Sequence, residues 1–559
     1  MENVPSPLKV LEEVPEKYGE NDLKITKFSL AKLHVFDLGS TLDFQLDTRT
    51  IVEDMVHCQL ALASSYPSLE PSIHGGEHFV AERAGSQVLK EQQEIMAEFE
   101  DLSSLLSACN RFDSDQTPEY VERQRSARAL FWPIMIRFEP SSTFSVAQVM
   151  ACIRNGGVCL NSYWVHLPDE DASVDRIIGL TEEARAIELE VALPSQLPET
   201  VGMGALDKLM EKVREEFPLQ DIEMVEDLET KEHNSQLSDR LGTTYVCYRC
   251  SFASLSRVYQ FLVRQLCRNY LKRVSGIRDM VMSDVIQTYY DVVLLHDLAT
   301  EVENPFEEIV RKYPRQICGL ATNDRDFRAN APPYVRSNVV DFSPETRTTS
   351  IVSTSAFLKL HSSEIWRKII DSNSKRRTFV PAYEDIVDYC TIEIILCLYE
   401  LLACYDMQLT RLLEEERTGL DRLMSTERKI AYGLEEMFSV RHAIHASIED
   451  WWSLAENALG VQELSRATNS KLSVVRRLIS AGYQQRLNKV ILLLTSISGA
   501  LSVINLSLSL GVPPIGSISL GVVALAAILL LAHRVGIVNI ADWYKSTLKG
   551  LHDTGDEST

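Results

Sequence analysis

The sequence predicts an α/β cytoplasmic domain followed by long stalk helices and a C-terminal two-helix transmembrane hairpin. Three observations support this prediction. The first 380 residues of the 559-residue chain mix short apolar runs typical of strands with runs of good helix formers. From Tyr383 to Lys489 there is no proline, and apolar residues recur near helical spacing. From Val490 to Ala532 there is no Asp, Glu, Lys, Arg or His.

The α/β domain is expected over residues 1–380, with a lobe boundary near residues 194–200, where the composition is typical of turns. Leu130 to Phe138 is a short apolar run with Pro133 inside it, which indicates an edge strand or a bulge. The other segments with a clear preference are strands at Val158–Leu167, Thr244–Phe252 and Asp291–His296, and helices at Val80–Leu106 and Leu255–Val274.

The helical region is expected over residues 381–489. Its run from Ile386 to Leu402 is apolar enough to resemble a membrane span, but Glu393 and Glu400 lie within it, seven residues apart on one helical face. A packed soluble helix is therefore predicted there. An antiparallel helix pair is expected to lead toward the membrane, and its last helix, from about Val461, to continue without a break into the first apolar run.

The membrane hairpin is expected to consist of transmembrane helix 1 at residues 490–510, an external turn at 511–517 and transmembrane helix 2 at 518–534. The first run has 21 residues and, at about 1.5 Å of rise each, covers the roughly 30 Å of a hydrocarbon core. Gly511, Pro513 and Pro514 mark the turn. The alternative is a buried helical hairpin in a soluble core.

The flanking charges predict the orientation of the hairpin. The connecting turn carries no charge, whereas cations flank both apolar runs: Arg476, Arg477, Arg486 and Lys489 before the first, and His533, Arg534, Lys545 and Lys549 after the second. The positive-inside rule therefore places both termini, including a tail at residues 535–559, in the cytoplasm. This predicts a multi-pass protein of the inner (plasma) membrane, with the lipid bilayer as one partner.

The first apolar run carries a polar stripe. Six polar residues fall on one helical face: Asn488, Thr495, Ser498, Ser502, Asn505 and Ser509. Such a stripe either lines a water-filled pore in an oligomer or forms hydrogen bonds within a dry helix bundle. Ser and Thr alone favour the dry bundle, because their hydroxyls bond back to their own helix. The two Asn amides, which are costly at membrane depth, favour the pore.

The rest of the chain offers one basic helix and little sign of catalysis. The net charge of −23 argues against nucleic-acid binding over most of the body. Arg264, Arg268 and Lys272 are successive i,i+4 neighbours, which predicts either a site for a phosphate-containing ligand or, alternatively, a solvated face or salt bridges within the chain. No convincing nucleophile, metal cluster or nucleotide-fold motif is evident, so an enzyme is not predicted.

The segment Gln485-Arg-Leu-Asn-Lys-Val-Ile491 resembles the N-R-x-N entrance to the first span of the CorA family of divalent-metal channels. The resemblance covers roughly the final 180 residues by architecture and about 30 by local pattern. It implies a homo-pentamer in which the first span lines the pore, Asn488 lies at the cytoplasmic entrance, and Mg²⁺ or another divalent cation permeates.

The chain departs from that family at the external loop, where Gly511-Val-Pro-Pro514 replaces Gly-Met-Asn. This departure argues against selective magnesium uptake and is similar to the divergent CorA-like effectors of type III CRISPR systems. That likeness implies a nucleotide second messenger as ligand, with the helix around Arg264 as its candidate site. Three functions therefore stay open: an ion-conducting pore, a nucleotide-activated antiviral effector, and a membrane-anchored signalling scaffold that does not conduct.

Overall fold

The computed structural model describes residues 9–16, 22–38, 47–58, 60–66, 77–80, 126–138, 144–154, 157–166, 172–183, 187–195, 197, 203, 205–217, 221–225, 245–275, 287–298, 300–343, 346–373, 383–415, 419–441 and 446–534. The chain divides into two compact units. Unit 1 comprises residues 1–408 and 429–469, and unit 2 comprises residues 409–428 and 470–559. The helix expected at Val80–Leu106 falls almost wholly outside the described residues.

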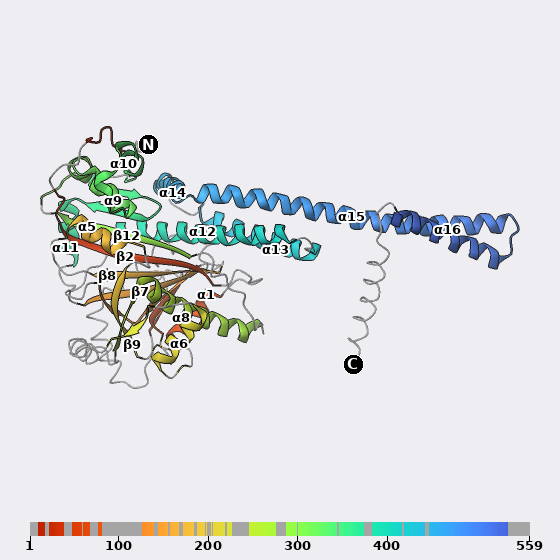
Figure 1. Cartoon of the computed structure of the whole chain (residues 1–559), viewed down its shortest axis with the longest axis horizontal. Helices are drawn as coiled ribbons and strands as arrows, with labels where there is room; N and C mark the ends of the chain where they lie inside the picture. The colour runs from red at the N-terminus through yellow and green to blue at the C-terminus, as the bar shows by residue number, and fades with distance from the viewer. Residues whose placement is uncertain are drawn as a thin grey trace. The chain divides into compact units, whose positions relative to one another are not determined.

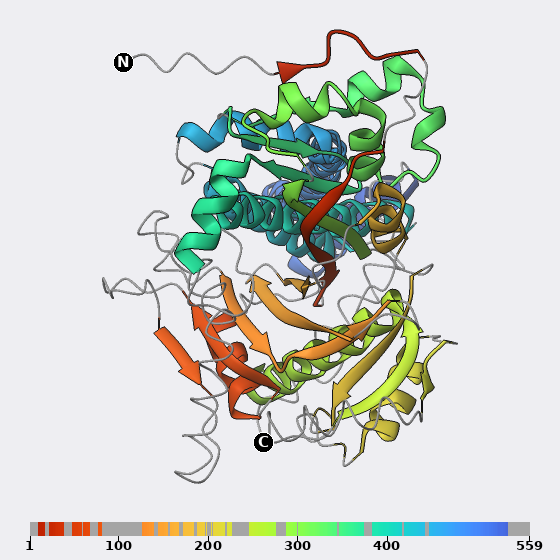
Figure 2. The same ribbon diagram turned by 90° about the vertical axis from the view of Figure 1, so that its left-hand side faces the viewer.

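Unit 1 is sheet-rich in its N-terminal part (Figures 1 and 2). Its described strands form one 13-stranded sheet in which only β12 and β15 are parallel neighbours. The main path runs β10 (Glu223–Met224), β11 (Tyr245–Ser251), β9 (Glu188–Pro194), β6 (Ile134–Arg137), β7 (Ser145–Arg154), β8 (Val158–His166), β2 (Ile25–Asp37), β12 (Gln287–Leu298), β15 (Ala356–His361) and β14 (Thr348–Val352). Off this path, β5 (Ser126–Phe131) pairs with β7, β3 (Ala61–Tyr66) pairs with β5, and β4 (Glu77–Val80) pairs with β3. A separate two-stranded sheet pairs β1 (Lys9–Val10) with β13 (Val340–Asp341).

The predicted strands at β8, β11 and β12 are confirmed, although β12 is longer than expected. The expected edge position around Pro133 is wrong, because β6 lies between β7 and β9. The sheet accommodates the proline by an interruption: β5 ends at Phe131 and β6 begins at Ile134. The residue without a backbone N–H therefore falls between two strands rather than inside a ladder.

One face of the sheet is covered by helices in two groups. The first core packs α1 (Thr48–His57), α6 (Leu206–Glu216) and α8 (Phe252–Ser275) against alternate residues such as Val149 and Ile153 of β7. The second core packs α5 (Val174–Thr181), α9 (Pro314–Thr322) and α10 (Pro332–Asn338) against Val293 and Leu358. In Figure 2 the yellow-green helix α8 lies across the strands that contribute to the first core. The same core also contains Leu206, Met210 and Val213 of α6 and the following Phe217, all buried.

The second core contains a close helix contact at Gly319 of α9. A Cβ atom placed there would lie 2.6 Å from Cβ of Phe327, which is itself fully buried in the 3-10 turn η3 (Phe327–Ala329). Phe327 belongs to a packed core and cannot move aside without displacing its neighbours.

Gly319→Ala is therefore expected to lower the free energy of unfolding by about 1–3 kcal/mol, the usual cost of overpacking. The measurement is chemical denaturation of the full-length protein in detergent. Gly419→Ala is the matched control, since a Cβ there meets nothing within 4 Å. Equal stabilities for the two variants would contradict the contact.

From residue 363 onward the described elements are all helices, and the prediction of a helical region from residue 381 is confirmed. These helices are α11 (Ser363–Asn373), α12 (Tyr383–Glu414), α13 (Leu420–Arg441), α14 (Ala446–Ala458), α15 (Val461–Ser509) and α16 (Pro514–Arg534). The expectation that the last soluble helix continues into the first apolar run is confirmed, because α15 is unbroken over 49 residues. Within unit 2, α13 lies antiparallel to α15, since Glu427 pairs with Arg476 and Asp421 with Arg486.

Candidate functional site

All six residues of the predicted polar stripe lie on the exposed side of α15. The opposite side packs against α16 through small residues. Ser496, Ala500 and Ser507 are buried there, as are Ser517 and Gly521 of α16. A Cβ at Gly521 would lie 2.5 Å from Cγ1 of Ile504 and 3.2 Å from the carbonyl oxygen of Ala500. Close helix approach through small residues is typical of membrane helices.

Three of the four hydroxyl groups of the stripe bond within their own helix. Thr495 Oγ1 donates to the Ile491 carbonyl at 2.6 Å, Ser502 Oγ to that of Ser498 at 2.9 Å, and Ser509 Oγ to that of Leu506 at 2.7 Å. These bonds satisfy the hydroxyl donors without any partner outside the helix. The amides of Asn488 and Asn505 are exposed on the same side.

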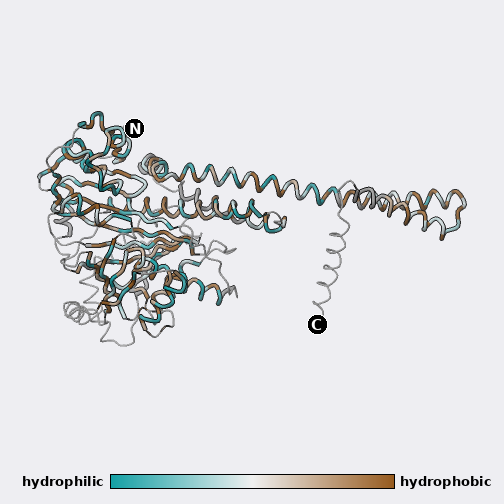
Figure 3. Tube along the Cα trace, in the orientation of Figure 1, coloured by the Kyte–Doolittle hydropathy of each residue, from teal (hydrophilic) through white to brown (hydrophobic). Residues whose placement is uncertain are grey.

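Apolar residues predominate in α16 and in the part of α15 that pairs with it (Figure 3). Many of their large side chains are exposed. Leu494, Leu506 and Val523 are 59%, 63% and 65% exposed. Among the described residues, α15 alone has the length and apolar composition of a membrane span, and 18% of its most apolar stretch is buried within the structure. The apolar stretch of α16, Pro514–Ala527, is shorter.

The predicted external turn is tight. Gly511 adopts a left-handed conformation (φ +77°) directly after α15, and the Val512 N–H donates to the Ser507 carbonyl at 3.1 Å. This arrangement closes the helix with a glycine cap. Pro514 then occupies the first turn of α16, where a missing N–H costs nothing.

The structure shows how the candidate anion site on α8 is engaged. Arg264 is buried, and its Nε and Nη2 donate to the Asp37 carbonyl at 3.1 and 3.0 Å. Arg268 forms a two-point ion pair with Glu216 at 2.8 and 2.9 Å. Lys272 is exposed. A backbone carbonyl thus engages Arg264, and a phosphate would have to displace Glu216 from Arg268. The anion site stays a prediction.

A buried polar interface lies between α12 and the face of the sheet opposite α8. Along α12, residues spaced by three or four form one stripe toward the sheet: Asp385, Tyr389, Glu393, Cys397, Glu400 and Cys404, all buried. The sheet meets this stripe with residues that alternate with its core residues, such as Arg154 beside Ile153. Glu393 and Glu400 thus sit on a packed helix of unit 1, as predicted.

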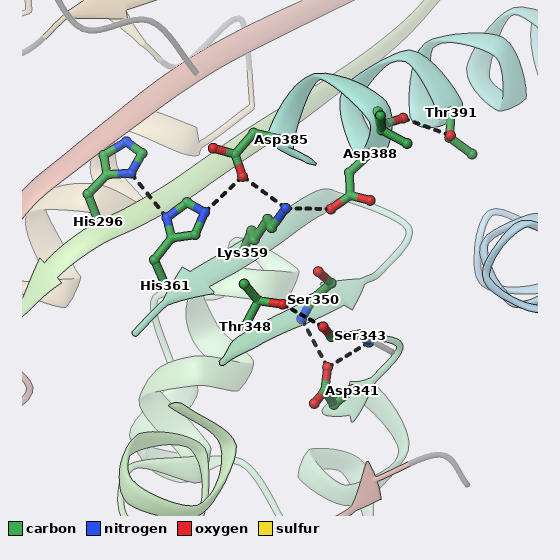
Figure 4. A network of polar contacts seen from close by, with 11 residues as sticks. His296, Asp341, Ser343, Thr348, Ser350, Lys359, His361, Asp385, Asp388 and Thr391 are labelled. Atoms are coloured by element: carbon green, nitrogen blue, oxygen red, sulfur yellow. Dashed lines mark hydrogen bonds and ion pairs between the residues drawn. The ribbon is translucent and has the colours of Figure 1, made fainter. Parts of the chain in front are cut away.

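At one end of the stripe, Asp385 joins α12 to β15 (Figure 4). Lys359 Nζ lies 2.9 Å from Asp385 Oδ1 and 2.8 Å from Asp388 Oδ2. Burial acts to raise the pKa of Asp385, but His361 and Lys359 outweigh it and hold that pKa well below its usual range. Burial acts to lower the pKa of Lys359, and the two aspartates raise it instead. The pair is therefore held in its charged form.

Two histidines extend this network away from α12. His361 Nε2 lies 2.8 Å from Asp385 Oδ1, His361 Nδ1 lies 3.2 Å from His296 Nδ1, and His296 Nε2 lies 2.9 Å from Ser29 Oγ. Only one proton can occupy the line between the two Nδ1 atoms, so one imidazole donates and the other accepts. The chain can hold or relay a proton between β2, β12 and β15, at a position buried from solvent.

In the middle of the stripe, Glu393 accepts from two strand arginines. Arg128 Nη2 lies 2.6 Å and Arg154 Nη2 lies 3.1 Å from Glu393 Oε1, and all three side chains are almost fully buried. Burial acts to raise the pKa of Glu393, but the two guanidinium groups outweigh it and lower that pKa. The site is a buried triad of two cations and one carboxylate.

At the far end of the stripe, Glu400 has no cation within salt-bridge distance among the described residues. Thr288 Oγ1 donates to its Oε2 at 3.0 Å, and its buried Oε1 has no hydrogen-bond partner there. Burial, with a smaller contribution from the Asp37 carboxylate, raises the pKa of Glu400 to about 8. Glu400 is therefore protonated at neutral pH.

Comparison with known proteins adds no assignment, because the chain matches no protein-family model, no curated protein and no solved structure. The resemblance to CorA channels stays a prediction from the motif at residues 485–491 and the order of the elements. Within the described ranges, no group of three or more His, Cys, Asp or Glu residues is arranged to hold a metal ion.

The sequence analysis did not identify two features. The first is the polar interface of α12: Asp385 lies eight residues before Glu393 and extends the stripe of Glu393 and Glu400, and each of its strand partners Arg128, Arg154 and Lys359 is a charged residue within a short apolar strand. The second is the small-residue side of α15, which the spacing of its Ser and Ala residues indicates.

Proposed function

We propose that this protein is an oligomeric membrane protein whose α15–α16 hairpin spans the bilayer and whose α15 stripe lines an ion-conducting path. The observation that carries the proposal is the exposure of both the apolar and the polar surface of α15. A helix from the core of a soluble protein would bury its leucines, whereas those of α15 are largely exposed. Complete transfer of a Leu or Val side chain out of water is worth about 1.5–3 kcal/mol, and each of these side chains would gain the fraction of that value that is still exposed.

The polar stripe supports self-assembly. Because α16 packs against the other side of α15, the stripe is left for water or for another copy of the chain. Asn488, Thr495, Ser502 and Ser509 recur every seven residues. A seven-residue repeat keeps one face of a helix directed at a partner helix through a left-handed supercoil. An amide such as that of Asn505 is costly in hydrocarbon, and a shared aqueous path would hydrate it.

The helices before the span fit a stalk in this proposal. The antiparallel contacts of α13 with α15 include Tyr483 OH at 2.7 Å from Met424 Sδ as well as the two ion pairs. Mg²⁺ or another divalent cation is the permeant ion that the CorA resemblance suggests, and ligand-gated permeability is the variant that the altered external loop suggests.

A membrane-anchored scaffold without conduction is the second candidate. The observation in its favour is that three hydroxyl groups of the stripe bond back to their own helix. Hydroxyls satisfied in this way can face a dry helix interface without an unpaired donor.

Substitution within the stripe separates the two candidates. For a pore, Ser502→Leu and Asn505→Leu are each expected to reduce ion flux at least tenfold, because an apolar side chain dewets a narrow path. Flux is measured in liposomes with magnesium and with monovalent ions, before and after adding candidate nucleotides. Ser519→Leu is the matched control, since Ser519 is exposed on α16 and lies off the stripe.

Three outcomes decide the assignment. Lost flux in the stripe variants with normal flux in Ser519→Leu supports the pore. Normal flux in all three variants rejects the pore lining. If alkaline carbonate leaves the protein in the membrane but no condition gives flux, the scaffold becomes the assignment. If alkaline carbonate releases the protein, the membrane hairpin itself is rejected.

A further inference from the structure

The α15–α16 pair carries cations but no acidic residue over a long stretch. From Leu464 to Arg534 there is no Asp or Glu, although the protein as a whole has a net charge of −23. The Lys and Arg residues of this stretch are Arg466, Lys471, Arg476, Arg477, Arg486, Lys489 and Arg534. None of them lies between Val490 and Ala532, so the positive charge flanks the apolar part of the pair.

The register of the two helices brings cations from both to one level. Gly521 of α16 packs against Ala500 and Ile504 of α15. Arg534 lies thirteen residues beyond Gly521, and Lys489 lies thirteen residues before the midpoint of that contact. In an antiparallel pair, thirteen residues of rise on either helix correspond to about 20 Å, so Lys489 and Arg534 come to the same level.

Further residues of α15 complete this basic end, which we define as Tyr483, Arg486, Lys489, His533 and Arg534. Tyr483 is 51% exposed, and the Arg486 side chain is 57% exposed. Tyr and Arg beside an apolar span are typical of the headgroup region of a bilayer. The opposite end of the pair, Leu510 to Pro513, carries no charge.

Arg486 forms only a long, exposed ion pair, with Asp421 of α13. Asp421 Oδ1 lies 3.7 Å from Arg486 Nη1, and the Asp421 side chain is 82% exposed. An ion pair this long and this exposed contributes little, so a phosphate oxygen can compete with Asp421 for the guanidinium.

We propose that the basic end binds the phosphate headgroups of acidic phospholipids in the leaflet on its side of the bilayer. This inference rests on the proposed membrane insertion. Anionic leaflets attract Lys and Arg residues that lie within about a Debye length of the surface, and Arg binds phosphate oxygens in a two-point geometry. The other cations of α15 in unit 2 lie farther away, since Arg477 is twelve residues, or about 18 Å, before Lys489.

The test is retention of phosphatidylglycerol by the detergent-solubilised full-length protein, titrated against phosphatidylcholine and detected by native mass spectrometry. Arg486→Gln/Lys489→Gln is expected to weaken phosphatidylglycerol binding roughly 30-fold, given a contribution of about 1 kcal/mol from each cation near a charged leaflet. Arg476→Gln/Arg477→Gln is the matched control, because it also removes two charges of α15, one of them paired with an acid of α13. Asp421→Asn is expected to tighten binding, since it removes the competitor of the lipid phosphate.

Loss in the first double variant, normal binding in the control and a gain in Asp421→Asn together support the basic end as a lipid site. Equal losses in both double variants, or equal retention of the two lipids by the unmodified protein, overturn it. Displacement of phosphatidylglycerol by millimolar inorganic phosphate alone would assign the site to free phosphate instead. Carbonate extraction of the same samples reports insertion separately, so failure of the membrane proposal is distinguishable from failure of the lipid site.

Discussion

Glu393→Gln is expected to lower the free energy of unfolding by about 3–5 kcal/mol, the usual cost of breaking a buried ion pair by removing one partner. Glu393 is the shared carboxylate of Arg128 and Arg154, at 2.6 and 3.1 Å. The amide keeps the shape of the side chain but removes its charge. Two guanidinium groups would then remain in the interior without the carboxylate that offsets their desolvation.

The measurement is chemical denaturation of the full-length protein in detergent. Glu427→Gln is the matched control, because it also removes a carboxylate from an Arg pair, at 2.8 Å from Arg476, where the arginine is 57% exposed. An exposed pair of this kind contributes at most about 1 kcal/mol. A loss for Glu393→Gln no larger than that of the control would show that the triad does not stabilise the α12 interface.

A second variant distinguishes charge from packing. Replacing Arg128, Arg154 and Glu393 together by Met removes all three charges of the triad. Replacing a buried ionic triad by apolar residues of similar volume is often neutral or stabilising. The triple variant is therefore expected to be more stable than Glu393→Gln. The reverse order would show that the packing of these side chains, and not their charge, contributes more to the free energy of unfolding.

Glu400→Gln is expected to stabilise the protein by about 3–5 kcal/mol at pH 8.5 and to leave its stability nearly unchanged at pH 4. The pKa of Glu400 is raised to about 8 by burial, whereas an unfolded chain has a Glu pKa of about 4.3. The folded protein therefore binds this proton more tightly than the unfolded chain does. The resulting stabilisation is fully present below about pH 4.3 and is lost as the pH rises to about 8.

Glutamine imitates the protonated carboxyl at every pH. It has no charge to desolvate, and its amide oxygen still accepts from Thr288. The measurement is a series of denaturation curves between pH 4 and pH 8.5 for both proteins. The two series should meet at acid pH and diverge above about pH 5, and parallel series would contradict a neutral Glu400 in the folded state.

Sequence alone determined the elements of this protein whose signal is local. The absence of charge from Val490 to Ala532 predicted two apolar helices, because hydropathy is a property of consecutive residues. The seven-residue spacing of Glu393 and Glu400 indicated one face of a packed helix, because helical periodicity fixes which side chains share a face. The glycine and prolines at residues 511–514 marked the turn for the same local reason.

Only the tertiary structure decided which residues meet across long separations. Glu393 receives cations from Arg128 and Arg154, more than 200 residues away, and nothing in the spacing along the chain pairs them. The same holds for Arg264, since its spacing along α8 gives no sign of the Asp37 carbonyl, 227 residues away, to which it donates. Pairing of this kind is set by strand order and burial. Only the position of the sheet shows that the α12 stripe meets charged side chains, and that among the described residues Glu400 has no salt-bridge partner.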